Sequence, residues 1–375
     1  QPEVVHYSGH MVSAVGVAGR FPHDQVESVT TGIRQVLASP RIGFLHGSLA
    51  SGADIIVAEI ALEIGAELHL VLPFSAEEFV AVSVAPAGPD WAARFHRCLD
   101  AATSVVVASD SAYLGDDVLF AYAAQMSMGQ ALNRAKGLDA TAWQLAVFDG
   151  VDAGTGGTPV AGTAHDIAVW ANAGGVTRVV PVRSTRVEPP QGPSPASAPR
   201  RRIRSVLFGD VKGFSRLRDE HIDAFLHTIM TPVAEVLDGY GDSVLVRNTW
   251  GDGLFVVMDD AVTGAHCALD LQDCFATMDL EGAGLPTDMA MRLGGHIAPV
   301  ISVHDPVLHK PTVMGRELTR AARIEPRTPP GAVYVTAAFA ALLALEPDCD
   351  VTVEYVGHLT TAKDFETTGM YLLRR

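Results

Sequence analysis

A proline- and serine-rich stretch divides this chain into two parts with different patterns. Residues 184–202, STRVEPPQGPSPASAPRRR, show no apolar periodicity, so they offer no face that a core could bury. We therefore predict an interdomain linker here, between a first domain of residues 1–183 and a second domain of residues 203–375. Two domains suit a chain of 375 residues.

Before the linker, strand-like runs alternate with helix-like runs. The predicted strands are residues 12–19 (VSAVGVAG), 67–74, 102–109, 143–150 and 176–182, together with the start of residues 41–65. Helical spacing of apolar residues covers residues 24–39 and the end of residues 41–65. Because strands that alternate with helices indicate a parallel sheet covered on both faces, we predict an α/β, Rossmann-like fold for the first domain.

After the linker the order of elements changes. A strand at residues 204–211 precedes a long helix over roughly residues 214–238, and two strands flank a Gly-Asp-Gly turn within residues 242–260. A helix at roughly 261–276, a long strand at 289–305, a helix at 316–325 and strands at 332–339, 351–357 and 368–374 follow. This order predicts an α+β fold with a ferredoxin-like βαββαβ core, a largely antiparallel sheet and helices to one side.

Two aspartates of the second domain stand where such a sheet could bring them together. Asp210 ends the apolar strand VLFGD, and Asp252 lies in the turn of the next predicted hairpin, within NTWGDGLF (248–255). Two carboxylates at neighbouring strand ends suit Mg²⁺, which fills its remaining positions with water and phosphate oxygens. Taken singly, each has an ordinary explanation, since Asp-Gly is common in hairpin turns and a strand-end aspartate can cap the next helix.

Four motifs in the second domain resemble, in order, those of the class III nucleotide cyclases. They are FGDVKGFS (208–215), TWGD (249–252), GRELTRAAR (315–323) and AKDF (362–365). The resemblance covers roughly residues 203–375 and implies the class III cyclase fold. Such enzymes are lyases that convert a nucleoside triphosphate into a 3′,5′-cyclic nucleotide and pyrophosphate by two-metal catalysis.

Residue by residue, the resemblance implies a set of groups for this reaction. Asp210 and Asp252, with the carbonyl of Val211, would bind two Mg²⁺ or Mn²⁺ ions per site. Arg323 would stabilise the charge on the α-phosphate through its fixed guanidinium donors, and Lys363 would contact the triphosphate. In this family the metal aspartates come from one subunit and the arginine and the base-reading residues from the other, so the resemblance also implies a head-to-tail homodimer.

The residues expected to read the base depart from the purine pattern. Asn248 stands where purine cyclases keep a lysine, Thr312 stands at its partner's position, and Phe214 belongs to the same nucleotide site. An asparagine amide both donates and accepts, so it can pair with uracil or cytosine as well as with adenine. We therefore favour UTP or CTP, as in the Pycsar-like pyrimidine cyclases of anti-phage signalling, whose product (cUMP or cCMP) a separate effector protein binds.

Two alternatives stay open. The first is an adenylate or guanylate cyclase. The second is a catalytically degenerate module for nucleotide binding or dimerisation, in which Asn248 and Thr319, the residue at the position of the transition-state asparagine, mark lost catalysis. The presence of both Asp210 and Asp252 favours the active enzyme, because an inactive one has no physical need for two adjacent carboxylates.

The first domain has glycine-rich loops between predicted strands and helices, which can admit a phosphate to a helix N-terminus. Over roughly residues 10–183 these loops resemble the SLOG superfamily of Rossmann-like domains, which implies a nucleotide-like ligand. The implied pocket residues are Gly16, Gly19, Arg20, Ser51, Gly52, Asp54, Gly156, Gly157 and Thr158. Glycines that only permit tight turns and close packing explain the pattern equally well. A hydrolase pair of Arg20 with Glu59 is conceivable, but an ordinary surface pairing is favoured.

Charge and cysteine content exclude some classes of function. A formal net charge of −16 argues against general binding to nucleic acid, which requires a basic face. The four cysteines form no C-x-x-C pair and show no zinc spacing with histidine, so we predict free thiols in a reducing compartment. Apolar runs stay shorter than the roughly 18–20 residues that a membrane helix needs, so we expect a soluble cytoplasmic protein without a membrane partner.

Overall fold

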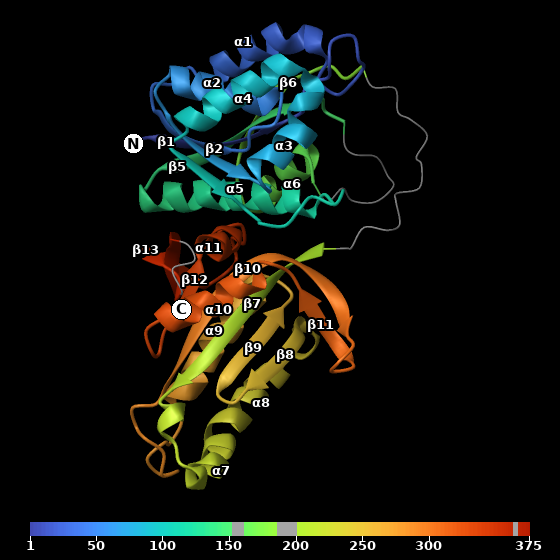
Figure 1. Ribbon diagram of the computed structural model, residues 1–375. Helices are drawn as coiled ribbons and strands as arrows, with labels where there is room; N and C mark the ends of the chain where they lie inside the picture. The colour runs from blue at the N-terminus through green and yellow to red at the C-terminus, as the bar shows by residue number, and fades with distance from the viewer. Residues whose placement is uncertain (152–160, 186–200, 363–366) are drawn as a thin grey trace. The chain divides into compact units, whose positions relative to one another are not determined.

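The computed structural model describes residues 1–151, 161–185, 201–362 and 367–375, which fold into two compact units (Figure 1). One unit comprises residues 1–200 and 344–347, and the other comprises residues 201–343 and 348–375. The division falls inside the predicted linker, but Arg201 and Arg202 already belong to the first strand of the second unit. They pair with Ile301 and Val300, so the last two residues of the predicted linker, 201 and 202, are part of the sheet.

The first unit contains a six-stranded sheet in the order β4-β3-β2-β1-β5-β6, in which all neighbouring strands are parallel. The strands are β1 (Glu3–Gly9), β2 (Ile42–Gly47), β3 (Glu67–Leu72), β4 (Ser104–Val107), β5 (Thr141–Phe148) and β6 (Thr177–Pro181). The prediction of a parallel α/β sheet is therefore confirmed. The chain moves outward from β1 to β4 and then crosses back to β5, so the direction of the connections reverses between β1 and β5.

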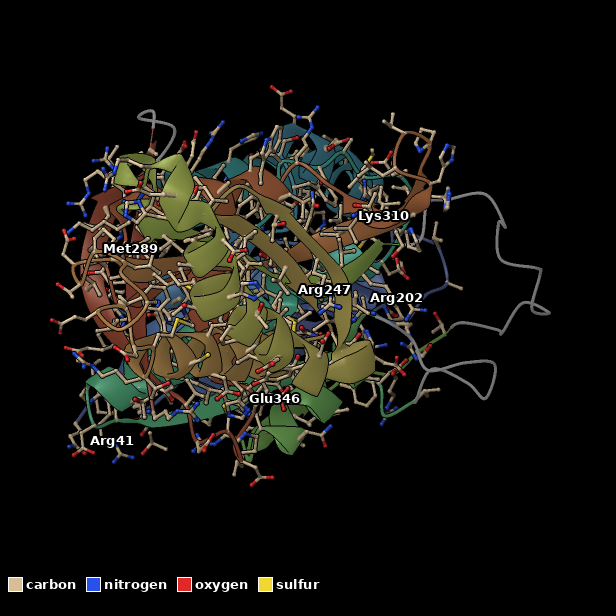
Figure 2. The ribbon with its side chains drawn as sticks, turned by 90° about the horizontal axis from the view of Figure 1, so that it is seen from below. Arg41, Arg202, Arg247, Met289, Lys310 and Glu346 are labelled. Carbon is tan, nitrogen blue, oxygen red and sulfur yellow. The ribbon has the colours of Figure 1, made fainter. Side chains whose placement is uncertain are left out.

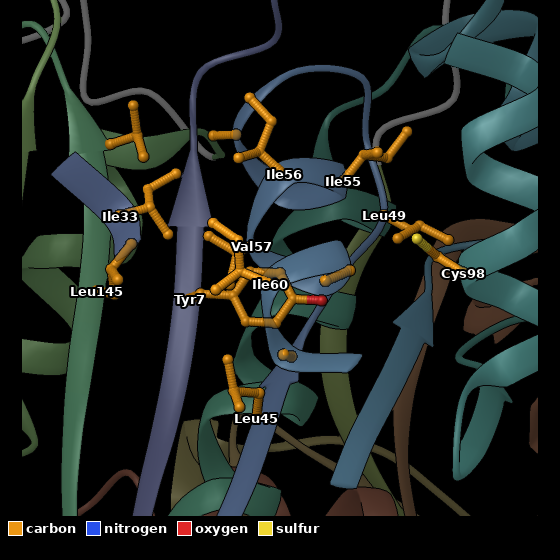
Figure 3. Close-up of a cluster of buried hydrophobic side chains, with 14 of the residues drawn as sticks. Tyr7, Ile33, Leu45, Leu49, Ile55, Ile56, Val57, Ile60, Cys98 and Leu145 are labelled. Atoms are coloured by element: carbon orange, nitrogen blue, oxygen red, sulfur yellow. The ribbon is translucent and has the colours of Figure 1, made fainter. Parts of the chain in front are cut away.

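Helices cover both faces of this sheet (Figure 1). They are α1 (Val26–Val36), α2 (Ala53–Glu63), α3 (Ala76–Ser83), α4 (Pro89–Ala101), α5 (Val118–Gly137) and α6 (Thr163–Asn172). Figure 3 shows the core on the α1 and α2 side, where Tyr7 and Leu45 of the sheet meet Ile56 and Ile60 of α2. On the other face, Met128 of α5 and Trp170 of α6 belong to a separate buried cluster. Burial on both faces explains why the strands read as nearly continuous apolar runs.

The prediction of a strand at residues 12–19 is wrong, and the first strand is instead β1 (Glu3–Gly9). Val15 and Val17 are 76% and 56% exposed, so the apolar residues of the predicted strand belong to a surface loop. The sequence of β1 does not read as a buried strand because it contains the polar residues Glu3 and His6, although these are only 7% and 1% exposed. Both are satisfied by β5, since Trp143 donates to Glu3 at 2.9 Å and the Gln144 amide lies 3.2 Å from His6.

The second unit contains a mixed eight-stranded sheet in the order β13-β14-β12-β10-β7-β9-β8, with β11 paired to β10. The strands are β7 (Arg201–Lys212), β8 (Val244–Trp250), β9 (Gly253–Met258), β10 (Ala290–Asp305), β11 (Lys310–Met314), β12 (Val333–Thr336), β13 (Thr352–Thr360) and β14 (Thr367–Arg374). Among the described strands of this second sheet, only the pairing of β10 with β12 is parallel. The order β10-β7-β9-β8 is that of a βαββαβ core, as predicted.

Helices of the second unit lie on both faces of its sheet, so the prediction of helices to one side is wrong. They are α7 (Ile222–Phe225), α8 (Thr231–Gly239), α9 (Ala261–Ala276), α10 (Leu318–Ile324) and α11 (Ala337–Leu343). Successive residues of a strand point to opposite faces. A Cβ on Gly294 would meet the backbone of Ala321 at 2.8 Å, whereas a Cβ on Gly295 would approach the ring of Phe339 at 3.6 Å. Thus α10 and α11 flank β10 from opposite sides.

The helix predicted over residues 214–238 is shorter and less regular than expected. The segment starts with two 3₁₀ turns, at Phe214–Arg216 and Asp219–His221, and only then enters α7. A π-helical turn at Leu226–Met230 joins α7 to α8. Among the residues that the structure describes, no helix of either unit is long and apolar enough to cross a bilayer.

Candidate functional site

The end of β7 and the turn between β8 and β9 lie side by side in the second unit. The antiparallel pairing of β7 with β9 ends at Gly209 and Leu254, which leaves Asp210 next to the turn that precedes β9. Asp210 continues the alternation of Val206 and Phe208, which lie in the apolar cluster that includes residues of α10. Gly251 has a φ of +64°, a conformation that favours glycine, and so permits the tight turn that holds Asp252.

The two aspartates predicted as metal ligands therefore meet. The pKa of Asp252 is raised to about 6, first by burial and then by the hydrogen bond and the negative charge of Asp210. The backbone N–H of Val211 opposes this shift. A divalent cation would stabilise such a site, because it would remove the repulsion that Asp252 experiences from the neighbouring carboxyl.

An arginine and a glutamate that sequence reasoning missed complete the charges of this site. Arg292 of β10 faces Asp210 in register, and its Nη2 donates to Asp210 Oδ2 at 2.7 Å. Its Nε forms an ion pair with Glu325, which follows α10. Burial raises the pKa of Glu325 to about 6; Arg292 lowers it, while the charges of Asp210 and Asp252 raise it. One signal was present, since Arg292 is a charged residue inside the otherwise apolar start of a long strand.

The donors at this site fit Mg²⁺ or Mn²⁺. Asp210 and Glu325 bind the guanidinium of Arg292, and Asp252 adjoins Asp210, so this cluster has three carboxyls to one guanidinium and an excess of negative charge when the carboxyls are ionised. Hard divalent cations prefer carboxylate and carbonyl oxygens, and both aspartates and the adjacent backbone provide them. Arg292 takes only Oδ2 of Asp210, which leaves the other oxygen of that carboxylate for a cation.

The residues predicted to contact the nucleotide lie on several elements of the second unit. A Cβ on Gly251 would lie 3.6 Å from the ring of Phe214, so Phe214 borders the aspartate turn. Asn248 is exposed on β8 and pairs with Phe255 of β9, and Thr312 lies on β11, which neighbours β8. Figure 2 labels Arg247, the residue before Asn248, on the same part of β8. The structure thus places the two predicted base-reading residues on neighbouring strands.

The residues predicted for transition-state stabilisation lie on α10. Thr319 is exposed, and its hydroxyl donates to the carbonyl of Arg316 at 3.0 Å. Arg323 is in the last turn of the same helix. Within the described part of the chain, no hydrogen bond joins Thr319, Thr312 or Asn248 to the two aspartates. Lys363 lies outside the described residues.

In the first unit, Gly19, Arg20 and Asp54 line a cavity at the carboxyl ends of the strands. The other described candidates, Gly16, Ser51 and Gly52, are not among the residues that line it. Packing explains Gly52, which has a φ of +98° and would place a Cβ 2.4 Å from the backbone nitrogen of Val12. The predicted Gly156, Gly157 and Thr158 lie outside the described residues.

The hypothetical hydrolase pair of Arg20 and Glu59 is not formed. Arg20 forms an ion pair with Asp149 at 3.2 Å, and Glu59 forms one with Arg94 at 2.6 Å. The surface pairing of Arg20 with Glu59 that sequence reasoning favoured is therefore also wrong, because each residue has a closer partner from another element.

The four cysteines are free thiols, as predicted. One of them has a neighbour that the sequence did not indicate. His266 of α9 lies 2.7 Å from Asp350, and the ligand atoms of both residues and of Cys349 lie within 4.8 Å of one another. This trio mixes soft and hard donors, and Asp350 is exposed, so its ion pair with His266 accounts for the contact.

Comparison with known proteins gives one relative by sequence and several by fold. No protein-family model matches the chain. The chain is 31% identical over 143 residues to "Putative adenylate cyclase 3" of Rhizobium meliloti (strain 1021), a match that covers 36% of this chain. The chain spans about a fifth of the length of that relative, because the match covers 22% of it.

Solved structures of nucleotide cyclases match about half of this chain. The adenylyl cyclase CyaB from P. aeruginosa matches with a TM-score of 0.41 and 16% identity, over 47% of this chain and 95% of its own. The guanylyl cyclase Cya2 matches with a TM-score of 0.40 and 21% identity, over 47% of this chain and 94% of its own. A monomeric adenylate cyclase from Trypanosoma brucei matches with a TM-score of 0.39 and 20% identity, over 46% of this chain and 87% of its own.

Proposed function

We propose that the second unit is a nucleotide cyclase, a lyase that converts a nucleoside triphosphate into a 3′,5′-cyclic monophosphate and pyrophosphate. The observation that supports this most strongly is the juxtaposition of Asp210 with Asp252, two carboxyls that are 42 positions apart in sequence and within hydrogen-bond reach of each other. Two aligned carboxylates with an adjacent backbone carbonyl suit the two-metal chemistry of phosphoryl transfer. The sequence match to a protein named as an adenylate cyclase points the same way.

In this proposal Asp210, Asp252 and the Val211 carbonyl would hold two Mg²⁺ or Mn²⁺ ions. Those ions, when bound, supply the positive charge that favours ionisation of the ribose 3′-hydroxyl and departure of pyrophosphate. The 3′-oxygen then bonds to the α-phosphorus as the bond to the β-phosphate oxygen breaks. Arg292 and Glu325 position Asp210 for this role, because the guanidinium ties that carboxylate to the sheet and to the end of α10.

The remaining groups would come from a second copy of the chain. Arg323 and Thr319 lie on α10, where no described hydrogen bond links Thr319 to the aspartates of the same copy. A head-to-tail homodimer would bring Arg323 of one copy to the α-phosphate bound by the aspartates of the other, and Lys363 to the triphosphate. A fixed guanidinium suits the growing charge on a phosphoryl oxygen.

For the base we propose a pyrimidine, with Asn248, Thr312 and Phe214 in the nucleotide pocket. Asn248 is exposed on β8, next to the strand of Thr312, and its amide can both donate and accept. The product would be cUMP or cCMP, a signal for a separate effector protein in a response such as anti-phage defence. Adenylate or guanylate cyclase activity is the alternative that the names of the similar proteins favour.

The test is incubation of the purified full chain with ATP, GTP, CTP or UTP and Mn²⁺, with the cyclic product identified by its mass. We expect one or both pyrimidine triphosphates to be turned over fastest. Asp252→Asn should abolish turnover, whereas Asp242→Asn, a matched change of an exposed aspartate at the other end of β8, should leave it unchanged. Absence of a cyclic product from all four triphosphates would refute the enzyme, and triphosphate binding without turnover would favour the degenerate module.

For the first unit we propose a ligand-binding, SLOG-like domain that regulates the second. Gly19, Arg20 and Asp54 line its cavity, and a cavity at the carboxyl ends of parallel strands is the usual position of a ligand in this class of fold. Deletion of residues 1–183 should change the rate of the cyclase reaction if the unit regulates it, and an unchanged rate would contradict the regulatory role.

A further inference from the structure

The cavity of the first unit lies where the sheet reverses its connections. It has a volume of about 620 Å³ and is lined by the end of β1, by Ser48 and Ala50 after β2, and by the start of α6. In open α/β sheets, ligands bind in the crevice outside the carboxyl ends of the strands at this reversal, which falls here between β1 and β5. The volume is within the range of sites for drug-sized molecules.

Two buried carboxyl groups face this cavity. Asp54 of α2 is 7% exposed, and its Oδ2 accepts from the N–H of Ala50 at 3.2 Å. Its Oδ1 has no partner in hydrogen-bond geometry among the described residues, although the N–H of Gly9 is near enough to the carboxyl to oppose the rise of its pKa. Asp166 of α6 is also 7% exposed and accepts from the hydroxyl of Ser8 at 2.6 Å. A buried carboxylate oxygen without a partner is costly, so a ligand that donates a hydrogen bond to Asp54 would stabilise this site.

The cavity offers little positive charge to an anion. Arg20 is the one arginine or lysine among the described lining residues, and Asp149 and the carbonyl of Val151 already bind it, at 3.2 and 2.7 Å. The two lining histidines, His6 and His10, are 1% and 6% exposed, and burial lowers the pKa of both. Residues 152–160 (DAGTGGTPV) contribute no lysine, arginine or histidine to this unit.

One wall of the cavity is aromatic. Phe79, Tyr113 and Phe120 line it, and the rings of Tyr113 and Phe120 meet edge to face with centroids 5.4 Å apart. Phe74 stacks behind Tyr113 at 5.2 Å and so fixes the orientation of that ring. Such a wall suits a flat ring, and the carboxyls suit hydroxyl or amino groups attached to it.

We propose that the cavity of the first unit binds a flat aromatic molecule that offers hydroxyl or amino donors and has no anionic group. A free nucleoside is one source of this chemistry and an aromatic amine is another. A donor of the ligand bonds to Oδ1 of Asp54, and its ring lies beside Tyr113 and Phe120. The same molecule with a 5′-phosphate binds less tightly, because the carboxylates repel the phosphate and Arg20 is already paired. This site does not depend on the proposed cyclase activity.

The experiment is calorimetric titration at pH 8, where Asp54 and Asp166 are largely ionised, of the full chain with adenosine, guanosine, cytidine, uridine, their 5′-monophosphates, and tyramine. Chelator is present, so that no divalent metal can hold phosphates at Asp210 and Asp252. We expect at least one nucleoside, or tyramine, to bind at least about tenfold more tightly than the monophosphates. Nucleoside binding identifies the first source and tyramine binding the second. Monophosphates that bind as tightly as nucleosides, or a lack of binding by every probe, would overturn the proposal.

Two variants separate a role in binding from a role in folding. Asp54→Asn should weaken the binding of the probe about tenfold, because a strong hydrogen-bond acceptor becomes a donor. It should also narrow the gap in affinity between nucleoside and monophosphate. Loss of folding alone would weaken all probes equally and leave that gap unchanged, a result that would also count against the proposal. Tyr113→Leu should weaken binding without narrowing the gap. Asp24→Asn, at an exposed aspartate of the same unit, is the matched control and should bind as the wild type does.

Discussion

Replacement of Asp54 by asparagine should stabilise the first unit at alkaline pH and leave it nearly unchanged at acidic pH. Burial raises the pKa of Asp54 to about 7 from its ordinary value of 3.8, and the charge of Asp166 adds to the rise. The folded state therefore keeps a proton on Asp54 at pH values where the unfolded chain has lost it. The free energy of unfolding must fall as the pH rises from 3.8 to about 7, and asparagine, which does not titrate, removes that loss.

The size of the effect follows from the same shift. A rise of this size corresponds to a ceiling of about 4 kcal/mol. Because Asp54 is only 7% exposed, water screens little of this electrostatic effect. We therefore expect asparagine to add about 2 to 4 kcal/mol to the free energy of unfolding at pH 8. For a unit of this size that is an increase in unfolding temperature of about 5 to 10 °C. Below pH 3.8, where Asp54 is protonated in both the folded and the unfolded chain, the difference should be close to zero, and at pH 5 it should be about 1 to 2 kcal/mol, well below its value at pH 8.

Tryptophan fluorescence can follow this unit selectively. Trp91, Trp143 and Trp170 belong to the first unit and are at most 4% exposed, whereas Trp250 of the second unit is 91% exposed. Unfolding of the first unit should therefore dominate the red shift of the emission. Asp24→Asn, the exposed control, should melt as the wild type does at both pH values. Equal destabilisation by Asp54→Asn at pH 5 and pH 8 would refute the reasoning, because it would mean that the carboxylate is the preferred folded form.

Three further predictions concern the second unit. Asp252→Asn should raise the free energy of unfolding of the metal-free protein by about 1 kcal/mol at pH 8, because the pKa of Asp252 is raised to about 6 and water screens the partly exposed pair. Mn²⁺ should raise the unfolding temperature of the wild type and not that of the variant. Arg292→Gln should lower stability by about 2 to 3 kcal/mol, and more at pH 8 than at pH 5, because it leaves Asp210 and Glu325 without their cation; thermal melting at the two pH values checks this. Asn248→Lys should shift turnover from pyrimidine to purine triphosphates in a competition assay, and an unchanged preference would exclude Asn248 from base reading.

The pairing of Asp210 with Asp252 could be predicted from the sequence because motif order fixed the order of the strands. A strand followed by a helix and a hairpin leaves few arrangements, and in the βαββαβ arrangement the hairpin turn lies beside the end of the first strand. The ion pairs of Arg292 could not be predicted in this way. They depend on the register of β10 against β7, which joins residues 82 positions apart and leaves no periodic signal.

The first strand was missed for a related reason. A buried strand is recognised by its apolar run, and β1 interrupts that run with Glu3 and His6. The cost of burying these two polar side chains is offset by hydrogen bonds to Trp143 and Gln144 of β5. Those partners are 140 and 138 positions away in the sequence. Conversely, the apolar loop around Val15 and Val17 imitates a strand because local pattern cannot tell whether another element covers it.

The two candidate sites use the same physical device with opposite requirements. In both, burial and a neighbouring carboxyl raise the pKa of an aspartate toward neutrality. The neighbour of Asp54 is Asp166, and the neighbour of Asp252 is Asp210. The pair at Asp252 borders the exposed aspartate turn, and Arg292 offsets only part of the negative charge, so a divalent cation would relieve the repulsion. The pair in the first unit is nearly fully buried and has no unpaired arginine or lysine among the described lining residues, so a hydrogen-bond donor without negative charge would satisfy it better than an anion. Burial thus decides which kind of ligand each pair of carboxyls can accept.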